Sequence, residues 1–175
     1  LNDACNGQIK LVTAACEEES GMDFIRYVSK KCKVSLGHSS CSYEQAMEAF
    51  GNGASHVKHL FNAMEGLHHR RPGIAAAAMD AGVSTEIICD GVHIHPSVIR
   101  MAHRIYGERL NLISDSIRCT GMPDGEYLLG GQSVIVNDGI AHLAGTDTIA
   151  GSSVTMHKAL RNAVSFGIPL NDALY

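Results

Sequence analysis

Short apolar runs of strand length alternate along most of this chain with segments of helical periodicity. The predicted strands cover residues 9–15, 33–38, 56–61, 85–90 and 110–115, and the predicted helices cover residues 21–31, 42–50, 96–106 and 155–166. Repeated strand–helix units with short links favour a parallel sheet that is covered by helices. The alternation therefore predicts an α/β fold.

Local signals support the ends of several predicted helices. Ser42 is a candidate N-cap, and Gln45 is in the position of its capping-box partner. Pro96 lies near the first turn of its helix, where proline is favoured. The carboxylates at 17–19 are expected in the first turn of the helix at 21–31, where they would meet the positive end of the helix dipole.

The alternation of predicted strands and helices ends after Asp115. Residues 121–125 have turn composition, and residues 132–143 predict short strands around the turn Asn137-Asp138-Gly139. We therefore expect strand–helix units that carry the site over 8–120 and a β-hairpin excursion over 121–146, as part of an accessory sheet. A late loop and C-terminal helices are expected over 147–175.

Composition narrows the classes of partner and the compartment. The formal net charge of −4 excludes a broad basic surface, which argues against nucleic acid and anionic membranes. No apolar run reaches the roughly 18–20 residues of a membrane span. The six cysteines show no paired spacing, so we expect free thiols and a cytoplasmic protein. The 175 residues fall short of the ~250 of a complete (β/α)₈ barrel, and the first residues lack an initiator Met, so we expect part of a longer protein.

Polar side chains gather where the predicted strands end. His38, His59 and Asp115 lie at or near the ends of three strands, and Asp90 and His93 follow a fourth. The carboxyl ends of parallel strands form the reaction face of such folds, and two imidazoles with a carboxylate suit a divalent metal that keeps a position open for water. Taken singly, each histidine is more often structural and Asp115 more often a helix N-cap, so spacing alone leaves both interpretations open. The remaining histidines, 56, 68, 69, 95, 103, 142 and 157, are expected to be structural.

Six sequence blocks in a fixed order make the chain similar to a known family. They are GHS at 37–39, HLFNAM at 59–64, RRPG at 70–73, DGVH at 90–93, SD at 114–115 and TIAGSSVTM at 148–156. Together these blocks resemble the N-acetylglucosamine-6-phosphate deacetylases of the amidohydrolase superfamily. The resemblance implies part of a TIM (β/α)₈ barrel of the metal-dependent type. It also implies hydrolysis of the acetamide of N-acetyl-D-glucosamine 6-phosphate to glucosamine 6-phosphate and acetate, in amino-sugar catabolism.

The resemblance assigns roles residue by residue. His38 and His59 would bind the metal, with zinc expected and iron, cobalt or manganese as alternatives, and Asp115 would be the catalytic acid and base. Relatives of this type are dimers, so a homodimer is expected for the full-length protein. The residues that would contact the amino-sugar phosphate are Asn62, Ala63, Arg70, Asp90, Gly91, Val92, His93, Ile149, Ala150 and Gly151.

One departure from the family leaves alternatives open. The family's H-x-E-G-P segment, whose glutamate completes the metal site, and a carbonyl-polarising histidine have no match here and are expected upstream of the chain. By itself the chain would then bind metal weakly and turn over poorly. The alternatives are a deacetylase of another amino-sugar phosphate such as N-acetylgalactosamine 6-phosphate, a cyclic amidase with a metal-bridging lysine, and a non-catalytic sugar-phosphate-binding fragment.

Overall fold

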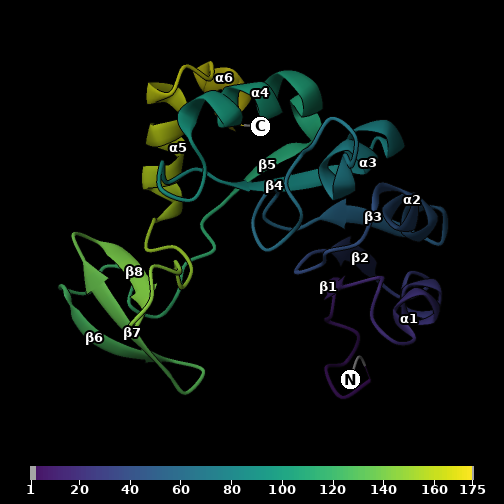
Figure 1. The fold of residues 1–175 in the computed structure, drawn as a ribbon, viewed down its shortest axis with the longest axis horizontal. Helices are drawn as coiled ribbons and strands as arrows, with labels where there is room; N and C mark the ends of the chain where they lie inside the picture. The colour runs from purple at the N-terminus through teal and green to yellow at the C-terminus, as the bar shows by residue number, and fades with distance from the viewer. Residues whose placement is uncertain (1–2, 175) are drawn as a thin grey trace. The chain divides into compact units, whose positions relative to one another are not determined.

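The computed structural model describes residues 3–174 (Figure 1), and the chain divides between Glu86 and Ile87 into two compact units. A parallel sheet has the strand order β1-β2-β3-β4-β5, and an antiparallel sheet has the order β6-β7-β8. The expected α/β class is confirmed. No helix of residues 3–174 is long and apolar enough to cross a membrane.

The first unit contains strands β1 to β3, helices α1 to α3 and the start of β4. Parallel pairing joins β1 to β2, β2 to β3 and β3 to β4, and the helices run along the strands (Figure 1). Fully buried side chains, among them Leu36, Val57 and Ile74, form its core. The bounds are β1 Leu11–Ala14, α1 Gly21–Val28, β2 Lys33–Leu36, α2 Tyr43–Gly51, β3 Ala54–Val57, α3 Gly73–Ala81 and β4 Ser84–Ile88.

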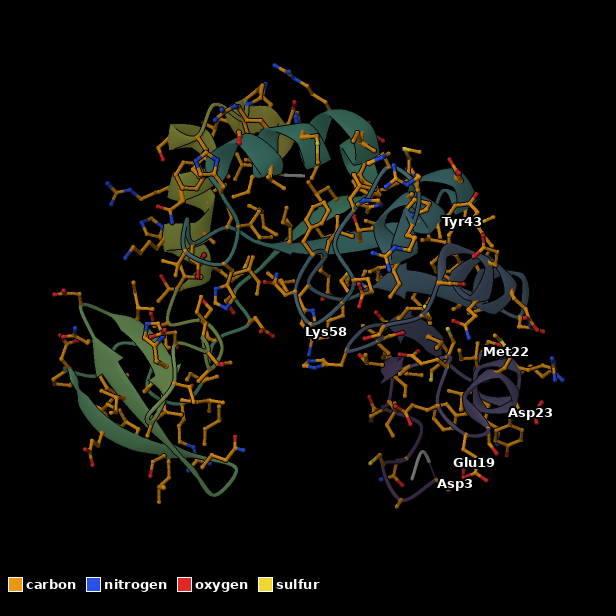
Figure 2. All side chains as sticks on the ribbon, viewed as in Figure 1. Asp3, Glu19, Met22, Asp23, Tyr43 and Lys58 are labelled. Carbon is orange, nitrogen blue, oxygen red and sulfur yellow. The ribbon has the colours of Figure 1, made fainter. Side chains whose placement is uncertain are left out.

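Helix α2 begins as the sequence predicts. The Ser42 side chain accepts a hydrogen bond from the Gln45 backbone, and the Gln45 side chain accepts one from the Ser42 backbone. Tyr43, labelled in Figure 2, donates its hydroxyl to Asp80 of α3 at 2.8 Å. The capping box is therefore confirmed, and a side-chain contact ties α2 to α3.

Two expectations for this unit are wrong, and one helix was not predicted. The strand predicted at 56–61 runs from Ala54 to Val57, because the left-handed backbone of His59 (φ 35°) cannot continue a strand. Helix α3 is absent from the prediction because its alanine-rich sequence is buried on most sides and shows no polar face. The carboxylates at 17–19 precede α1, which begins at Gly21 after a left-handed Ser20.

The second unit combines the end of β4 and β5 with a small antiparallel sheet and three α-helices. The turn predicted at Asn137-Asp138-Gly139 joins β7 to β8, as expected. A third strand, β6, pairs with β7, although the sequence predicts only a turn where β6 begins. The excursion is therefore a three-stranded sheet rather than a hairpin. The bounds are α4 Pro96–Tyr106, η1 Gly107–Arg109, β5 Leu110–Ile113, β6 Gly125–Leu129, β7 Gln132–Asn137, β8 Ile140–Leu143, α5 Met156–Ser165 and α6 Leu170–Leu174.

Candidate active site

Two histidines of the first unit lie side by side after neighbouring parallel strands. His38 follows β2 and His59 follows β3. Their ring centroids are 4.6 Å apart with an interplanar angle of 76°, and His59 is buried, with 3% of its surface exposed. Imidazoles this close can present nitrogens to one ion, so the pair fits the two-histidine part of a divalent metal site.

The predicted metal and acid/base residues share an uncommon backbone conformation. His38, His59 and Asp115 have φ angles of 48°, 35° and 46°. A left-handed backbone costs about 1–3 kcal/mol for a residue other than glycine, and such residues cluster at active sites and ligand clamps. At each of these residues the chain turns sharply after the strand. The strained positions are therefore the same ones that the sequence motifs identify.

The segment after His59 is held by its own hydrogen bonds. The Asn62 side chain donates to the carbonyls of His59 and Leu60, both at 3.3 Å, and the Asn62 backbone donates to His59 at 2.9 Å. The Ala63 carbonyl accepts from the Ser39 backbone at 3.1 Å. These bonds fasten the two histidine segments to each other, which keeps the pair together.

Arg70 lines a cavity of the first unit. The cavity has a volume of about 400 Å³, and Tyr43, His68 and Arg71 also line it. The Arg70 guanidinium is exposed and contacts the His69 ring at 2.6 Å. An exposed guanidinium at a cavity can bind an anion such as phosphate.

Residues of two predicted sugar-binding segments meet in the second unit. Asp90, Val92 and His93 from one segment, and Ile149 and Gly151 from the other, line one cavity of about 150 Å³. The sequence therefore identified two segments that are far apart in the chain but share a cavity. Lys158 of α5 also lines this cavity, although no motif singles it out.

The Asp90 carboxylate organises its own segment. It accepts hydrogen bonds from the backbones of Val92 and His93 at 2.8 and 2.9 Å and pairs with the His93 ring at 2.6 Å. Burial by itself would raise the pKa of Asp90, but the bonds from the His93 ring and the two backbone groups outweigh it, so the pKa lies below its ordinary value. Asp90 is therefore a charged group that orients His93.

Asp115 is joined to the late loop within the second unit. Its carbonyl accepts a hydrogen bond from Ser152 at 3.1 Å, and the Ser152 carbonyl accepts one from Ile117 at 2.9 Å. Gly151 has φ 105°, and a Cβ there would lie 2.7 Å from Cγ2 of Ile117. The close approach explains why this loop position requires glycine.

The candidate site residues thus form two groups, one in each unit. The structure brings His38 and His59 together, and separately brings the Asp90 segment together with the late loop. The convergence of Asp115 with the two histidines stays a prediction, as do the roles of the individual residues.

Ala150 belongs to the late loop and donates its backbone N–H to Ala141 at 2.8 Å.

Sequence reasoning misplaced Glu17. Rather than lying in the first turn of α1, Glu17 accepts hydrogen bonds through its carboxylate from the Ser39 hydroxyl and the Ser40 backbone, both at 2.5 Å. These two residues directly follow His38. A usable signal is that Glu17 follows β1, whose carboxyl end lies next to that of β2 in a parallel sheet.

The fold and these residues define a class of protein. Residues 20–175 match the sequence model of the amidohydrolase family, and the chain belongs to that family.

Individual relatives share a narrower description. The chain is 40% identical to the N-acetylglucosamine-6-phosphate deacetylase of Vibrio furnissii, over 90% of this chain and 40% of the relative. It is 35% identical to the N-acetylgalactosamine-6-phosphate deacetylase of Escherichia coli O157:H7, over 95% of this chain and 45% of the relative. A mutant of the Mycobacterium smegmatis N-acetyl-D-glucosamine-6-phosphate deacetylase, solved with N-acetyl-D-glucosamine-6-phosphate, superimposes with a TM-score of 0.94 at 40% identity, over 99% of this chain and 46% of that chain. The chain therefore spans less than half the length of these relatives.

Proposed function

We propose that this chain supplies two metal ligands, the acid/base and part of the substrate pocket of a deacetylase that acts on N-acetyl-D-glucosamine 6-phosphate. The observation that carries the proposal is the His38–His59 pair, whose rings lie 4.6 Å apart on left-handed backbone at the ends of adjacent parallel strands. The names of the similar proteins support the same substrate class.

The proposed chemistry is hydrolysis of the substrate acetamide. His38 and His59 would hold a divalent ion, for which we propose zinc, with iron, cobalt and manganese as alternatives. Such an ion polarises a carbonyl and lowers the pKa of water. The Asp115 carboxylate would take a proton from the attacking water and pass it to the departing sugar nitrogen.

The rest of the proposed site binds the substrate. Asn62, Ala63 and Arg70 are assigned to the phosphate side, and the Asp90 and Ile149 segments are assigned to the sugar. Because Asp90 fixes the His93 ring through its hydrogen bond at 2.6 Å, His93 can present its other ring nitrogen to the sugar phosphate. As a full-length protein the enzyme would form a homodimer.

A second candidate substrate is N-acetylgalactosamine 6-phosphate. The similar Escherichia coli protein of that name covers 95% of this chain. The two sugars differ in the orientation of one hydroxyl, so the comparison of kcat/KM on both phosphates decides between them.

Three variants of the full-length protein test the proposed roles by metal content and acetate release. His59→Ala should lose activity and the metal ion bound by the histidine pair. Asp115→Asn should keep the metal and lose activity by about 10²- to 10⁴-fold, the usual range for a general acid/base. His142→Ala, a histidine in β8, is the control and should keep both. Full activity in Asp115→Asn, or full metal content in His59→Ala, would contradict the assignment.

A further inference from the structure

We propose that Cys16, Glu17 and Cys41 form a binding site for a thiophilic divalent cation of the zinc type, distinct from the histidine pair. The two sulfur atoms and a carboxylate oxygen all lie within 4.8 Å of one another. The inference does not depend on the proposed deacetylase activity.

The parallel sheet creates this cluster from residues that are far apart in the chain. Cys16 and Glu17 follow β1, and Cys41 lies in the segment after β2. Because β1 and β2 are parallel, with Ala14 paired to Leu36, their carboxyl ends lie next to each other. Both thiols are almost fully buried, with exposures of 6% and 1%, whereas Glu17 is exposed. An ion would therefore reach the thiols from the side of the carboxylate.

The donor set suits zinc. Zinc binds thiolate sulfur at about 2.3 Å and carboxylate oxygen at about 2.0–2.2 Å in a tetrahedron, which places the donor atoms roughly 3.5–3.8 Å apart. The two sulfur atoms and the carboxylate oxygen of this cluster lie within 4.8 Å of one another, which is compatible with that spacing. Two thiolates select soft or borderline cations over magnesium and calcium, and water can fill the fourth position.

The two thiols of the cluster interact directly with each other. The Cys16 thiol hydrogen-bonds to Cys41, and this bond lowers the pKa of Cys41 against the effect of burial. The same interaction raises the pKa of Cys16. Binding of a divalent cation would displace the thiol protons to solvent and form two metal–sulfur bonds.

Outer hydrogen bonds hold the carboxylate in place. The Ser39 hydroxyl and the Ser40 backbone each donate to one oxygen of Glu17 at 2.5 Å, and the Cys41 backbone donates to the Ser39 hydroxyl at 3.4 Å. A carboxylate offers about four acceptor positions, so two hydrogen bonds leave lone pairs for an ion. Hydrogen-bonded ligands of this kind are typical of protein metal sites.

Cobalt(II) is the probe that separates this site from the histidine pair. Titration of the metal-free full chain with Co²⁺ should produce a thiolate-to-cobalt charge-transfer band, which imidazole ligands do not give. Cys16→Ser and Cys41→Ser should each abolish the band, and Glu17→Gln should weaken Co²⁺ binding by about 10-fold or more. Cys89→Ser, which changes a buried thiol outside the cluster, should keep it. No band in the unmodified chain, or an unchanged band in both serine variants of the cluster, overturns the proposal.

A second measurement needs no variant and so does not depend on whether a substituted chain folds. Zn²⁺ should protect Cys16 and Cys41 from alkylation in the unmodified chain, as mapped by mass spectrometry, and leave the labelling of Cys89 and Cys119 unchanged. Equal labelling of Cys16 and Cys41 with and without Zn²⁺ overturns the proposal. A metal-independent loss of both thiols through a Cys16–Cys41 disulfide also overturns it.

Discussion

Single residues with unusual backbone angles define the ends of the strands that carry the candidate site. His38, His59 and Asp115 are not glycines, yet each adopts a left-handed conformation. Side chains other than glycine adopt it at a cost, which the surrounding hydrogen bonds must offset. The bonds between Ser39 and Ala63 and between Ser152 and Asp115 provide such support.

Gly151 combines a positive φ angle with a close approach to a neighbouring side chain. Its φ is 105°, and an added Cβ would meet Ile117 at 2.7 Å, so Gly151→Ala should lower the free energy of unfolding by about 1–3 kcal/mol. Gly66→Ala is the matched control, because a Cβ there meets nothing within 4 Å, and it should be neutral or stabilising by about 0.4–1 kcal/mol. Urea unfolding of both variants measures the difference, and equal stability of the two would refute this account.

Asp90 makes stability depend on pH in a defined direction. Its pKa is held below the ordinary value of 3.8, so its charged form stabilises the folded state. That contribution is fully present at pH values well above 3.8 and is lost as the pH falls through the lower, folded-state pKa. The unfolding free energy of the unmodified chain should therefore exceed that of Asp90→Asn at neutral pH, with the gap narrowing in acid. A gap that widens as the pH falls below 3.8 would show that the sign is wrong.

Helix starts provide the clearest test at the scale of elements. The Ser42 hydroxyl accepts the capping bond from the Gln45 backbone, so Ser42→Ala should cost about 1 kcal/mol, within the 0.5–2 kcal/mol range of N-cap losses. Ser20 precedes α1 with φ 61° and makes no side-chain capping bond, so Ser20→Gly should not destabilise the chain. Thermal unfolding measures both. Equal losses of unfolding free energy in the two variants would mean that the Ser42 capping bond does not stabilise α2.

Elements with strong local signals were predictable from the sequence, and those determined by packing were not. The capping box at Ser42 and the Asn137-Asp138-Gly139 turn depend on neighbouring residues, and both are confirmed. Helix α3 has no polar face, so periodicity missed it, and β3 ends at Val57 before the strained His59, so periodicity misplaced its bounds.

The candidate site was likewise predictable from the sequence only in part. Motif order selected two segments that line one cavity, the first at Asp90 and the second at Ile149. The cluster of Cys16, Glu17 and Cys41 depends on which strands are neighbours in the sheet, and cysteine spacing along the chain does not contain that information.

At the scale of the whole molecule, each compact unit holds one part of the proposed site. The first unit holds the histidine pair and the Arg70 cavity, and the second holds Asp115 and the cavity lined by Asp90 and Ile149. Metal binding and phosphate binding are thus assigned to one unit, and proton transfer to the other. The proposed activity therefore requires residues of both units.

Arg70 provides the test of phosphate recognition in the full-length protein. Because a hydrogen bond to a charged group contributes about 1.5–3 kcal/mol, Arg70→Ala should raise KM for N-acetyl-D-glucosamine 6-phosphate by roughly 10- to 150-fold. Its kcat should change little, since the phosphate is bound equally in the ground and transition states. Arg71→Ala, which alters the other arginine of the same cavity, is the matched control and should change KM much less. Steady-state kinetics on the phosphorylated and unphosphorylated sugars separates the effects, and an equal loss on both substrates would remove Arg70 from the phosphate site.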